Sequence, residues 1–507
     1  MRSTLVINCC NILRSACIGR TFHISASTAF LLTRIISSSS VNTGFSGSGG
    51  NSSSTSGDSE IHCRKFENLR KSCTMSSISK EKVFIGPFIH TNDRGELIVV
   101  DHAAIFVEEG KIRDIVINPT SVDTKDKNVV VLSKDQFLVP GFIDCHIHAP
   151  QFPNVGVGYD KKLLEWLDTY TFPLEKKYKD ENFSEQVYDA VVKCTVALGT
   201  TTACYFASLY ANSSVILGQK AADIGQRALI GKLSMNLKRD DEYYESTEES
   251  VINLTKFVDS IDAINNPLVK AVVTPRFALS CDMTLMKELG KLAKKRDLHI
   301  QTHVSENLSE IEAVKQLFSD CSSYTDVYDT AGLLTNKTVL AHGVHLTDNE
   351  IAILKERGAA IIHCPSSNTC LRSGLCDVQR LKAEGLKLGL GTDISGGQSC
   401  SILDAMRSAL QVSNHLSFLK DDYQPLDYKD VFHMATLGGA TALAMSNEVG
   451  NFVVGKEFDA LVIDTSANNG SLNTLKHFNL EEKLQRLIYS GDDRHIIEVY
   501  IKGRKVK

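Results

Sequence analysis

The sequence lacks the features that would assign it to a membrane or to an oxidising compartment. Its 507 residues contain no run of 18 or more apolar residues, so no segment is predicted to cross a bilayer as a helix. The 14 cysteines include no C-x-x-C pair, and the equally spaced Cys364, Cys370 and Cys376 do not have zinc-ligand spacing. Scattered cysteines in apolar segments are typical of free thiols in a reducing compartment.

Neither sign of charge is in clear excess. Lys and Arg total 55 and Asp and Glu total 60, which gives a formal net charge of -5. Because proteins that bind nucleic acid carry a basic patch, we expect no nucleic acid partner, and we expect no membrane partner either. Hydrophobic residues make up 43% of the chain, which is enough for a large globular enzyme with an accessory domain.

The motifs of several enzyme classes are also missing. The sequence has no H-E-x-x-H of metalloproteases and no P-C-x-x-C of the cytidine-type zinc deaminases. It has no G-x-S-x-G nucleophile elbow and no phosphate-binding P-loop. These absences argue against the enzyme classes that those motifs mark.

The N-terminus differs from the rest of the chain. Residues 1–57 contain no Asp or Glu and four arginines, and serine dominates residues 37–56. This composition is typical of a mitochondrial transit peptide and cannot form a packed core. The alternative is an upstream extension, because Met75 would serve as an ordinary start. We treat residues 1–80 as a Ser/Gly-rich leader and expect a cytoplasmic enzyme, or a mitochondrial one if residues 1–57 are a genuine transit peptide.

Both ends of the remaining chain predict β-structure. Short apolar runs broken by turn residues occupy residues 81–139, and similar runs recur in residues 450–507. We therefore expect one small β-sandwich domain assembled from the segments on both sides of the central region.

The central region, residues 140–449, alternates between strand-like and helix-like patterns. Eight short apolar runs end in polar residues, and segments such as Met283–Arg296 and Ile402–Val412 have helical periodicity. Repeated strand–helix units predict a parallel sheet, and eight units predict an α/β fold of the (β/α)8 barrel type, in which chemistry lies at the C-terminal strand ends. The runs begin at Phe142, Thr202, Leu229, Ala271, His299, Val339, Ala360 and Leu388.

Residue types that bind metals follow several of these runs. His146 and His148 point to the same face of an extended segment, so both imidazoles can reach one ion. His303, His342 and Asp393 end the fifth, sixth and eighth runs, where a barrel delivers side chains to its active mouth. Nitrogen and oxygen ligands of this kind suit zinc or iron(II).

Glu306 lies three residues after His303, just beyond the fifth strand. A carboxylate at that position can reach a metal-bound water without coordinating the metal, which is the geometry of a proton shuttle. His345 and His363 are poorer candidates, because His345 lies past its strand end and His363 suits a core or supporting position.

These motifs resemble those of the amidohydrolase superfamily. The resemblance rests on Pro140-Gly-Phe-Ile-Asp-Cys-His-Ile-His, on the histidines that end strands five and six, and on Gly391-Thr-Asp. It extends from about Val83 to the C-terminus and sharpens to the guanine deaminase family. The segments similar to that family are His148–Gln151, Leu163–Pro173, Thr274–Phe277, His303–Glu306, Leu334–Lys337 and Gly450–Asp459.

The resemblance implies a set of roles for individual residues. One zinc ion per chain would be held by His146, His148, His303 and Asp393, since the fourth strand leads into Thr274-Pro-Arg and supplies no bridging lysine for a second metal. Gln151, Arg276 and Phe277 would bind the purine, through hydrogen bonds from the amide and guanidinium groups and through stacking of the ring. The ligands His148, His303 and Asp393 and the carboxyl of Glu306 would also border the substrate.

The implied reaction is hydrolytic deamination of guanine to xanthine and ammonia in purine catabolism, by an enzyme that works as a homodimer. Asp393 would accept or orient the water proton, and Glu306 would pass a proton to the ring nitrogen. His342 would stabilise the developing charge. Two alternatives stay open: a neighbouring amidohydrolase acting on a pterin, a triazine or an adenine derivative, and a barrel scaffold that has lost catalysis.

Overall fold

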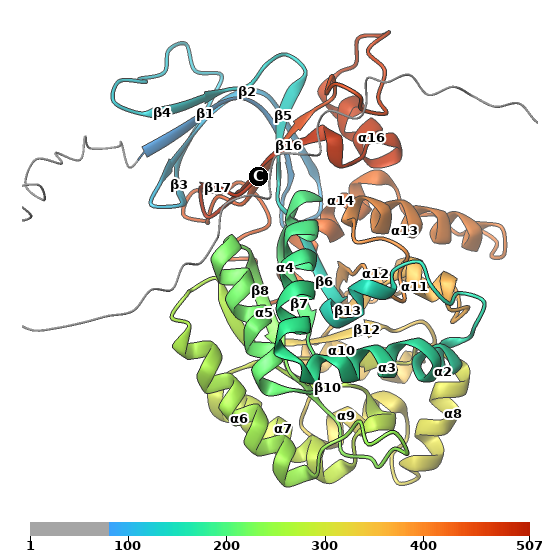
Figure 1. Cartoon of the computed structure of the whole chain (residues 1–507). Helices are drawn as coiled ribbons and strands as arrows, with labels where there is room; N and C mark the ends of the chain where they lie inside the picture. The colour runs from blue at the N-terminus through green and yellow to red at the C-terminus, as the bar shows by residue number, and fades with distance from the viewer. Residues whose placement is uncertain (1–80) are drawn as a thin grey trace, which may run out of the picture. The chain divides into compact units, whose positions relative to one another are not determined.

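A computed structural model describes residues 81–507, so the leader predicted at residues 1–80 lies outside the described residues. The described strands form two sheets, and each sheet collects strands that are far apart in the sequence (Figure 1). The first sheet is the barrel and the second is the accessory β-structure predicted from the two ends of the chain.

The barrel sheet is parallel throughout. Its eight main strands follow the order β14-β13-β12-β11-β10-β8-β7-β6, and the short β9 pairs with β10. The predicted strand runs are confirmed, and so is the (β/α)8 class. The strands are β6 (Phe142–His148), β7 (Thr200–Phe206), β8 (Arg227–Gly231), β9 (Leu233–Ser234), β10 (Val269–Pro275), β11 (His299–Val304), β12 (Thr338–His342), β13 (Ala360–His363) and β14 (Lys387–Leu390).

Helices follow most barrel strands and lie on the outside of the barrel (Figure 1). Local signals set their ends: α7 begins after Asp282, whose side chain accepts the Leu285 N–H, and ends in three basic residues that suit the negative end of the helix dipole. From residue 181 onward, the α-helices are α4 (Glu181–Ala197), α5 (Ala211–Ile224), α6 (Thr247–Ala263), α7 (Met283–Arg296), α8 (Leu308–Leu317), α9 (Tyr324–Thr330), α10 (Asp348–Arg357), α11 (Pro365–Cys370), α12 (Val378–Ala383), α13 (Ile402–Ser417), α14 (Tyr428–Ala435), α15 (Leu437–Ala442) and α16 (Leu480–Ser490).

The connection between β6 and α4 is long and contains only short helical turns. It carries Gln151 and the Trp166 ring, both of which are buried. Its elements are η1 (Ala149–Asn154), α2 (Leu163–Trp166), η2 (Leu167–Thr171), α3 (Phe172–Glu175) and η3 (Lys176–Lys179); elsewhere short turns form η4 (Ala278–Ser280) and η5 (Asp493–His495).

The second sheet combines both ends of the described chain. Its order is β17-β16-β15-β5-β1-β2-β3, with β4 paired to β1, so β15 from the C-terminal part lies beside β5 from the N-terminal part. Its hydrogen bonding is continuous, and Phe84 stacks on Phe458 at 4.4 Å in its core. The strands are β1 (Glu81–Thr91), β2 (Leu97–Glu108), β3 (Lys111–Ile117), β4 (Asn128–Val131), β5 (Gln136–Pro140), β15 (Ala460–Asp464), β16 (Ile496–Ile501) and β17 (Arg504–Lys505).

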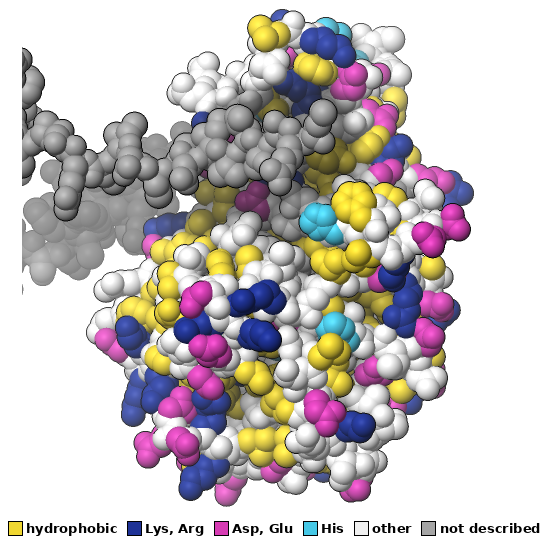
Figure 2. All heavy atoms as spheres, turned by 90° about the vertical axis from the view of Figure 1, so that its right-hand side faces the viewer, with side chains coloured by type: hydrophobic (Ala, Val, Ile, Leu, Met, Phe, Trp, Pro, Cys, Tyr) yellow, Lys and Arg dark blue, Asp and Glu magenta, His cyan; other side chains and the backbone are white. Residues whose placement is uncertain are grey.

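The surface and the cysteines agree with the composition. On the face drawn in Figure 2, basic and acidic side chains are interspersed. Residues 81–507 include no helix with the length and apolar content needed to cross a bilayer. The nine cysteines in this range are free thiols, among them the buried Cys364 and Cys376 and the half-buried Cys370.

A buried ion pair joins the barrel to the second sheet. Arg227, at the start of β8, donates to Asp459 at 3.1 Å and to Glu457 at 2.7 Å. Asp459 also accepts the backbone N–H of Lys502 at 2.8 Å. The Arg227 side chain is only 2% exposed, so its charge depends on these carboxylates rather than on water.

We therefore expect Arg227→Met to destabilise the protein by about 3–5 kcal/mol, because it leaves buried carboxylates without their partner. Thermal unfolding should show a fall in Tm of roughly 5 °C or more. Lys193→Met, which removes the solvent-exposed pair with Asp189, is the control and should change Tm by less than about 1 °C. An equal Tm for both variants would contradict a stabilising role for the buried pair.

Candidate metal centre and base pocket

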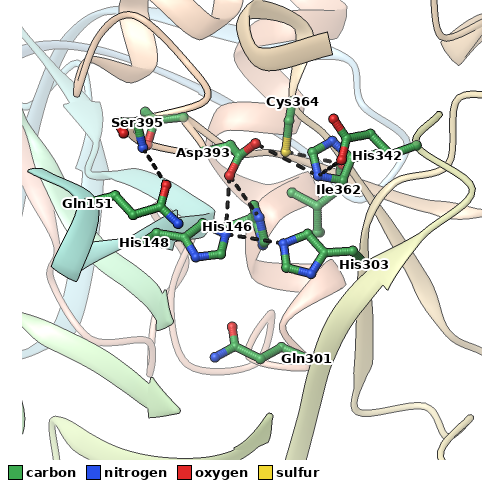
Figure 3. A network of polar contacts seen from close by, with 12 residues as sticks. His146, His148, Gln151, Gln301, His303, His342, Ile362, Cys364, Asp393 and Ser395 are labelled. Carbon is green, nitrogen blue, oxygen red and sulfur yellow. Dashed lines mark hydrogen bonds and ion pairs between the residues drawn. The ribbon is translucent and has the colours of Figure 1, made fainter. Parts of the chain in front are cut away.

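Four side-chain donor atoms converge at the C-terminal mouth of the barrel (Figure 3). The Asp393 Oδ1 atom lies 3.1 Å from Nε2 of His146 and 3.3 Å from Nε2 of His148. The Nε2 atoms of His148 and His303 are 3.2 Å apart. The structure thus brings together the four side chains that the sequence predicted as ligands.

The chemistry of these atoms fits a tetrahedral metal ion. Ligand atoms bound at about 2.0–2.1 Å to one tetrahedral ion lie ~3.4 Å from one another, close to the spacing seen here. Nδ1 of His303 lies 2.6 Å from the carbonyl oxygen of Arg276, to which it donates, so its Nε2 carries the lone pair that a metal needs. The donor atoms and these distances are therefore compatible with one bound metal ion.

The protonation states of the cluster suit metal binding. Burial lowers the pKa of His146, lowers that of His148 to about 4 and lowers that of His303 well below its usual range. Burial alone would raise the pKa of Asp393, but the neighbouring histidines hold it well below its ordinary value. Neutral imidazoles beside an ionised carboxylate are the forms that coordinate a metal.

The backbone around Asp393 is arranged to permit this convergence. Asp393 and His342 have φ of 47° and 76°, in the left-handed region that costs a non-glycine residue of order 1–3 kcal/mol. A Cβ on Gly391 would lie 2.8 Å from the Cβ of His146, so only glycine lets the chain leaving β14 pass this close to β6. The Gly391-Thr-Asp motif is thus a steric requirement of the site.

His342 lies beside the cluster, at the end of β12. His146, His342 and Asp393 form a second group of three whose ligand atoms lie within 4.8 Å of one another. His342 Nε2 is 3.8 Å from Asp393 Oδ2, the oxygen that does not face His148. Its Nδ1 bonds Asn368 Oδ1 at 2.9 Å. The other group of three is His146, His148 and His303. His342 also borders the cavity, where it can act on a bound molecule.

Glu306 lies next to the cluster without joining it. Its Oε2 is 3.5 Å from His342 Nε2, and its Oε1 accepts the Ser373 hydroxyl at 2.8 Å. Burial, with the negative charge of Asp393 nearby, raises the pKa of Glu306 to about 8. At neutral pH this carboxyl therefore carries a proton that it can donate.

A cavity opens over the cluster. Its empty volume, the solvent at its mouth included, is about 440 Å³. The predicted residues Gln151, Arg276 and Phe277 line it. So do Glu306, His342 and three of the four predicted ligands, namely His148, His303 and Asp393. Apolar side chains complete its walls, namely Leu163, Trp166, Leu167 and Leu371.

Glu175 is a site residue that the sequence reasoning missed. It lies at the end of α3, is fully buried, and contacts both Gln151 and Arg276. The available signal was its position, two residues after the Leu163–Pro173 segment. The supporting residues Asn368 and Ser373 were also missed, because neither belongs to a recognisable motif.

The residues judged unsuitable as ligands lie apart from the cluster. His345 Nε2 contacts the carbonyl oxygen of Ser373 at 2.8 Å, and burial lowers the pKa of His363 to about 3. Lys232, the buried lysine after β8, donates to Glu245 at 2.6 Å and to the Leu233 carbonyl oxygen, so its amine is engaged elsewhere.

A (β/α)8 barrel with this ligand cluster at its C-terminal mouth defines the class of metal-dependent barrel hydrolases. Residues 137–506 match the amidohydrolase family. The chain is 46% identical to guanine deaminase of Mus musculus over 438 residues, covering 84% of this chain and 96% of the mouse protein. It is 42% identical to guanine deaminase of Dictyostelium discoideum over 441 residues, covering 84% of this chain and 98% of that protein.

A solved structure shows the same fold. The chain superposes on guanine deaminase from C. acetobutylicum with bound guanine in the active site, with a TM-score of 0.80 and 34% identity, covering 84% of this chain and 100% of that one. The chain belongs to the amidohydrolase family and is a hydrolase similar to that family's guanine deaminases.

We expect the purified protein to contain about one metal ion per chain, and His303→Ala to lose most of it, because that change removes one of four ligands. Elemental analysis of the two proteins measures this directly. His345→Ala, outside the cluster, is the matched control and should keep its metal. Equal metal content in the His303 variant and the wild type would place the ion elsewhere.

Proposed function

We propose that this enzyme is a zinc-dependent guanine deaminase, which hydrolyses guanine to xanthine and ammonia in purine catabolism. The observation that carries the proposal is the pocket itself: Gln151 and Arg276, two hydrogen-bonding side chains suited to a purine, line the cavity directly over the ligand cluster. The similarity to guanine deaminases, including one solved with bound guanine, supports the same substrate.

His146, His148, His303 and Asp393 would hold one zinc ion. When bound, zinc supplies a Lewis acid that lowers the pKa of water towards about 7. We favour zinc because three imidazole nitrogens and one carboxylate are donors that this ion prefers at tetrahedral spacing.

The pocket would hold the base by hydrogen bonds and by contact with its face. Arg276 donates through its planar guanidinium, and Gln151 offers an amide that donates and accepts, which matches the ring nitrogens and carbonyl oxygen of guanine. Phe277 lines the cavity beside His303, with ring centroids 6.4 Å apart, so it can wall the pocket or contact the purine face. These contacts would orient the carbon that bears the amino group towards the cluster.

Two carboxyl groups in different protonation states would move the protons. Asp393, which is ionised, accepts the proton of the attacking water. Glu306, which is protonated at neutral pH, donates to the ring nitrogen beside the carbon under attack and makes that carbon more electrophilic. A C–O bond then forms, and Asp393 passes the proton that it took from water to the amine. The C–N bond breaks to release ammonia, and Glu306 regains a proton from the hydroxyl of the adduct as the new carbonyl forms.

His342 would stabilise the charge that develops during this addition. Its Nε2 lies between Glu306 and Asp393, at 3.5 Å and 3.8 Å from their oxygens. The hydrogen bond from Nδ1 to Asn368 fixes the ring, so the position of Nε2 is set before substrate binds. A homodimer and a cytoplasmic location complete the proposal as predictions.

We expect ammonia release from guanine, and none from adenine, cytosine or a pterin, because the polar groups of the pocket would be left unpaired by the wrong base. A coupled ammonia assay on purified protein, with zinc content measured in parallel, tests this. Turnover of a pterin, a triazine or an adenine derivative in place of guanine would assign the site to that substrate. Zinc without turnover of any of them would favour a non-catalytic scaffold.

Glu306→Gln should lower kcat for guanine by roughly 10²- to 10⁴-fold, because the amide has the same shape but cannot donate the proton. Zinc content should stay at about one per chain, since Glu306 is not a ligand. Glu312→Gln, on the exposed side of α8, is the control and should match the wild type. A Glu306 variant with full activity would remove this residue from the mechanism.

A further inference from the structure

Glu175 contacts the two polar side chains that line the base pocket. Its Oε1 atom accepts the Gln151 amide at 3.1 Å and one guanidinium nitrogen of Arg276 at 3.2 Å. Its Oε2 accepts the other terminal nitrogen of Arg276. The Glu175 side chain has no solvent exposure, and it lies behind the cavity rather than in its lining.

These bonds fix the orientation of Arg276. A bidentate carboxylate holds the guanidinium plane, because the fork of donors matches the two oxygens. The Phe172 ring lies against the same guanidinium, 4.8 Å from its central carbon. With Glu175 in the guanidinium plane and Phe172 against the guanidinium group, the Arg276 donors that Glu175 does not use point in fixed directions. Arg276 therefore loses no further side-chain freedom when a ligand binds.

The same carboxylate fixes Gln151. The amide nitrogen of Gln151 donates to Glu175, while its oxygen accepts the backbone N–H of Ser395 at 3.1 Å (Figure 3). A carboxylate can only accept a hydrogen bond, and a backbone N–H can only donate one. The two partners therefore determine which end of the Gln151 amide is the nitrogen and which is the oxygen. One N–H and one oxygen lone pair stay available to a ligand in a defined arrangement.

We propose that Glu175 is a positioning residue for substrate recognition: it orients Arg276 and Gln151 together and neutralises the buried guanidinium charge, so that the pocket selects an uncharged purine. This inference rests on the proposed function. A buried ion pair by itself is weak evidence of function, because such pairs also serve structure. What distinguishes Glu175 is that all three of its side-chain hydrogen bonds go to residues that line the cavity.

Kinetics of Glu175→Gln test the proposal. We expect kcat/KM for guanine to fall roughly 100-fold, mostly through a higher KM, since ground-state and transition-state binding would weaken together. Inhibition by hypoxanthine, which keeps the ring and carbonyl but has no amino group to lose, should weaken by a similar factor. Zinc content should stay at about one per chain, because Glu175 does not contact the ligands.

A double-mutant cycle separates positioning from a structural effect. In an Arg276→Met background, Glu175→Gln should cost less than about tenfold further, because the main group that it orients is already gone. Glu245→Gln, which breaks the buried pair with Lys232 outside the pocket, is the matched control: it should lower Tm and leave KM unchanged.

Two outcomes would overturn the inference: an unchanged KM in Glu175→Gln, or additive losses in the cycle. If Glu175→Gln does not fold, the comparison is made between Arg276→Met and the double variant, which removes both charges at once. A double variant with a KM like that of Arg276→Met supports positioning. A double variant with a much higher KM contradicts it. If the wild-type enzyme does not deaminate guanine at all, the proposed function fails, which is a separate result.

Discussion

The site depends on one constraint, the closure of the barrel between β6 and the segment that leaves β14. Asp144 is fully buried at this seam, accepts the Thr392 N–H at 3.1 Å and bonds the Thr392 hydroxyl and the His146 N–H as well. The next residue, Asp393, donates its own N–H to the His146 carbonyl oxygen at 2.9 Å. These bonds fix His146 against Asp393, two ligands that are 247 positions apart in the sequence. Burial raises the pKa of Asp144 to about 7, and three hydrogen bonds to its carboxyl hold the seam.

Around this seam, burial gives neighbouring groups different protonation states. The histidines of the cluster stay neutral because a buried imidazolium is poorly solvated, and they in turn stabilise the charge of Asp393. That charge, together with burial, keeps Glu306 protonated at neutral pH. One cavity therefore holds an ionised carboxylate and a protonated one side by side. In many hydrolases, different environments give two carboxyl groups different pKa values, so that one acts as the acid and the other as the base.

The sequence predicted the parts of this site that follow from hydrophobic periodicity and from position at the end of a strand. Strand runs that end in His or Asp can be read from the chain, because parallel barrel strands all deliver their C-terminal residues to one mouth. Similar strand patterns at both ends predicted one small β-sandwich assembled from the two segments. That β5 pairs with β15, within one continuously hydrogen-bonded sheet, is visible only in the folded chain. Glu175 could not be found this way, because it lies in a connection of short turns that has no sustained period. Its partners come from η1 and from the end of β10, and only the folded chain shows that they meet.

In this molecule the residues proposed for catalysis and those proposed to select the substrate come largely from different parts of the chain. The proposed metal ligands lie at or just after barrel strand ends, whose positions are fixed by the sheet. The turns between β6 and α4 supply much of the pocket above them. Those turns contribute Gln151, Trp166 and Glu175, and Glu175 bonds Arg276, which directly follows β10. Because no metal ligand lies within residues 149–179, changes there can alter which heterocycle fits while leaving the cluster intact. On this argument the heterocycle that fits this pocket would depend chiefly on the groups that hold it. Because one buried carboxylate bonds both the Gln151 amide and the Arg276 guanidinium, we expect these three residues to act as one unit.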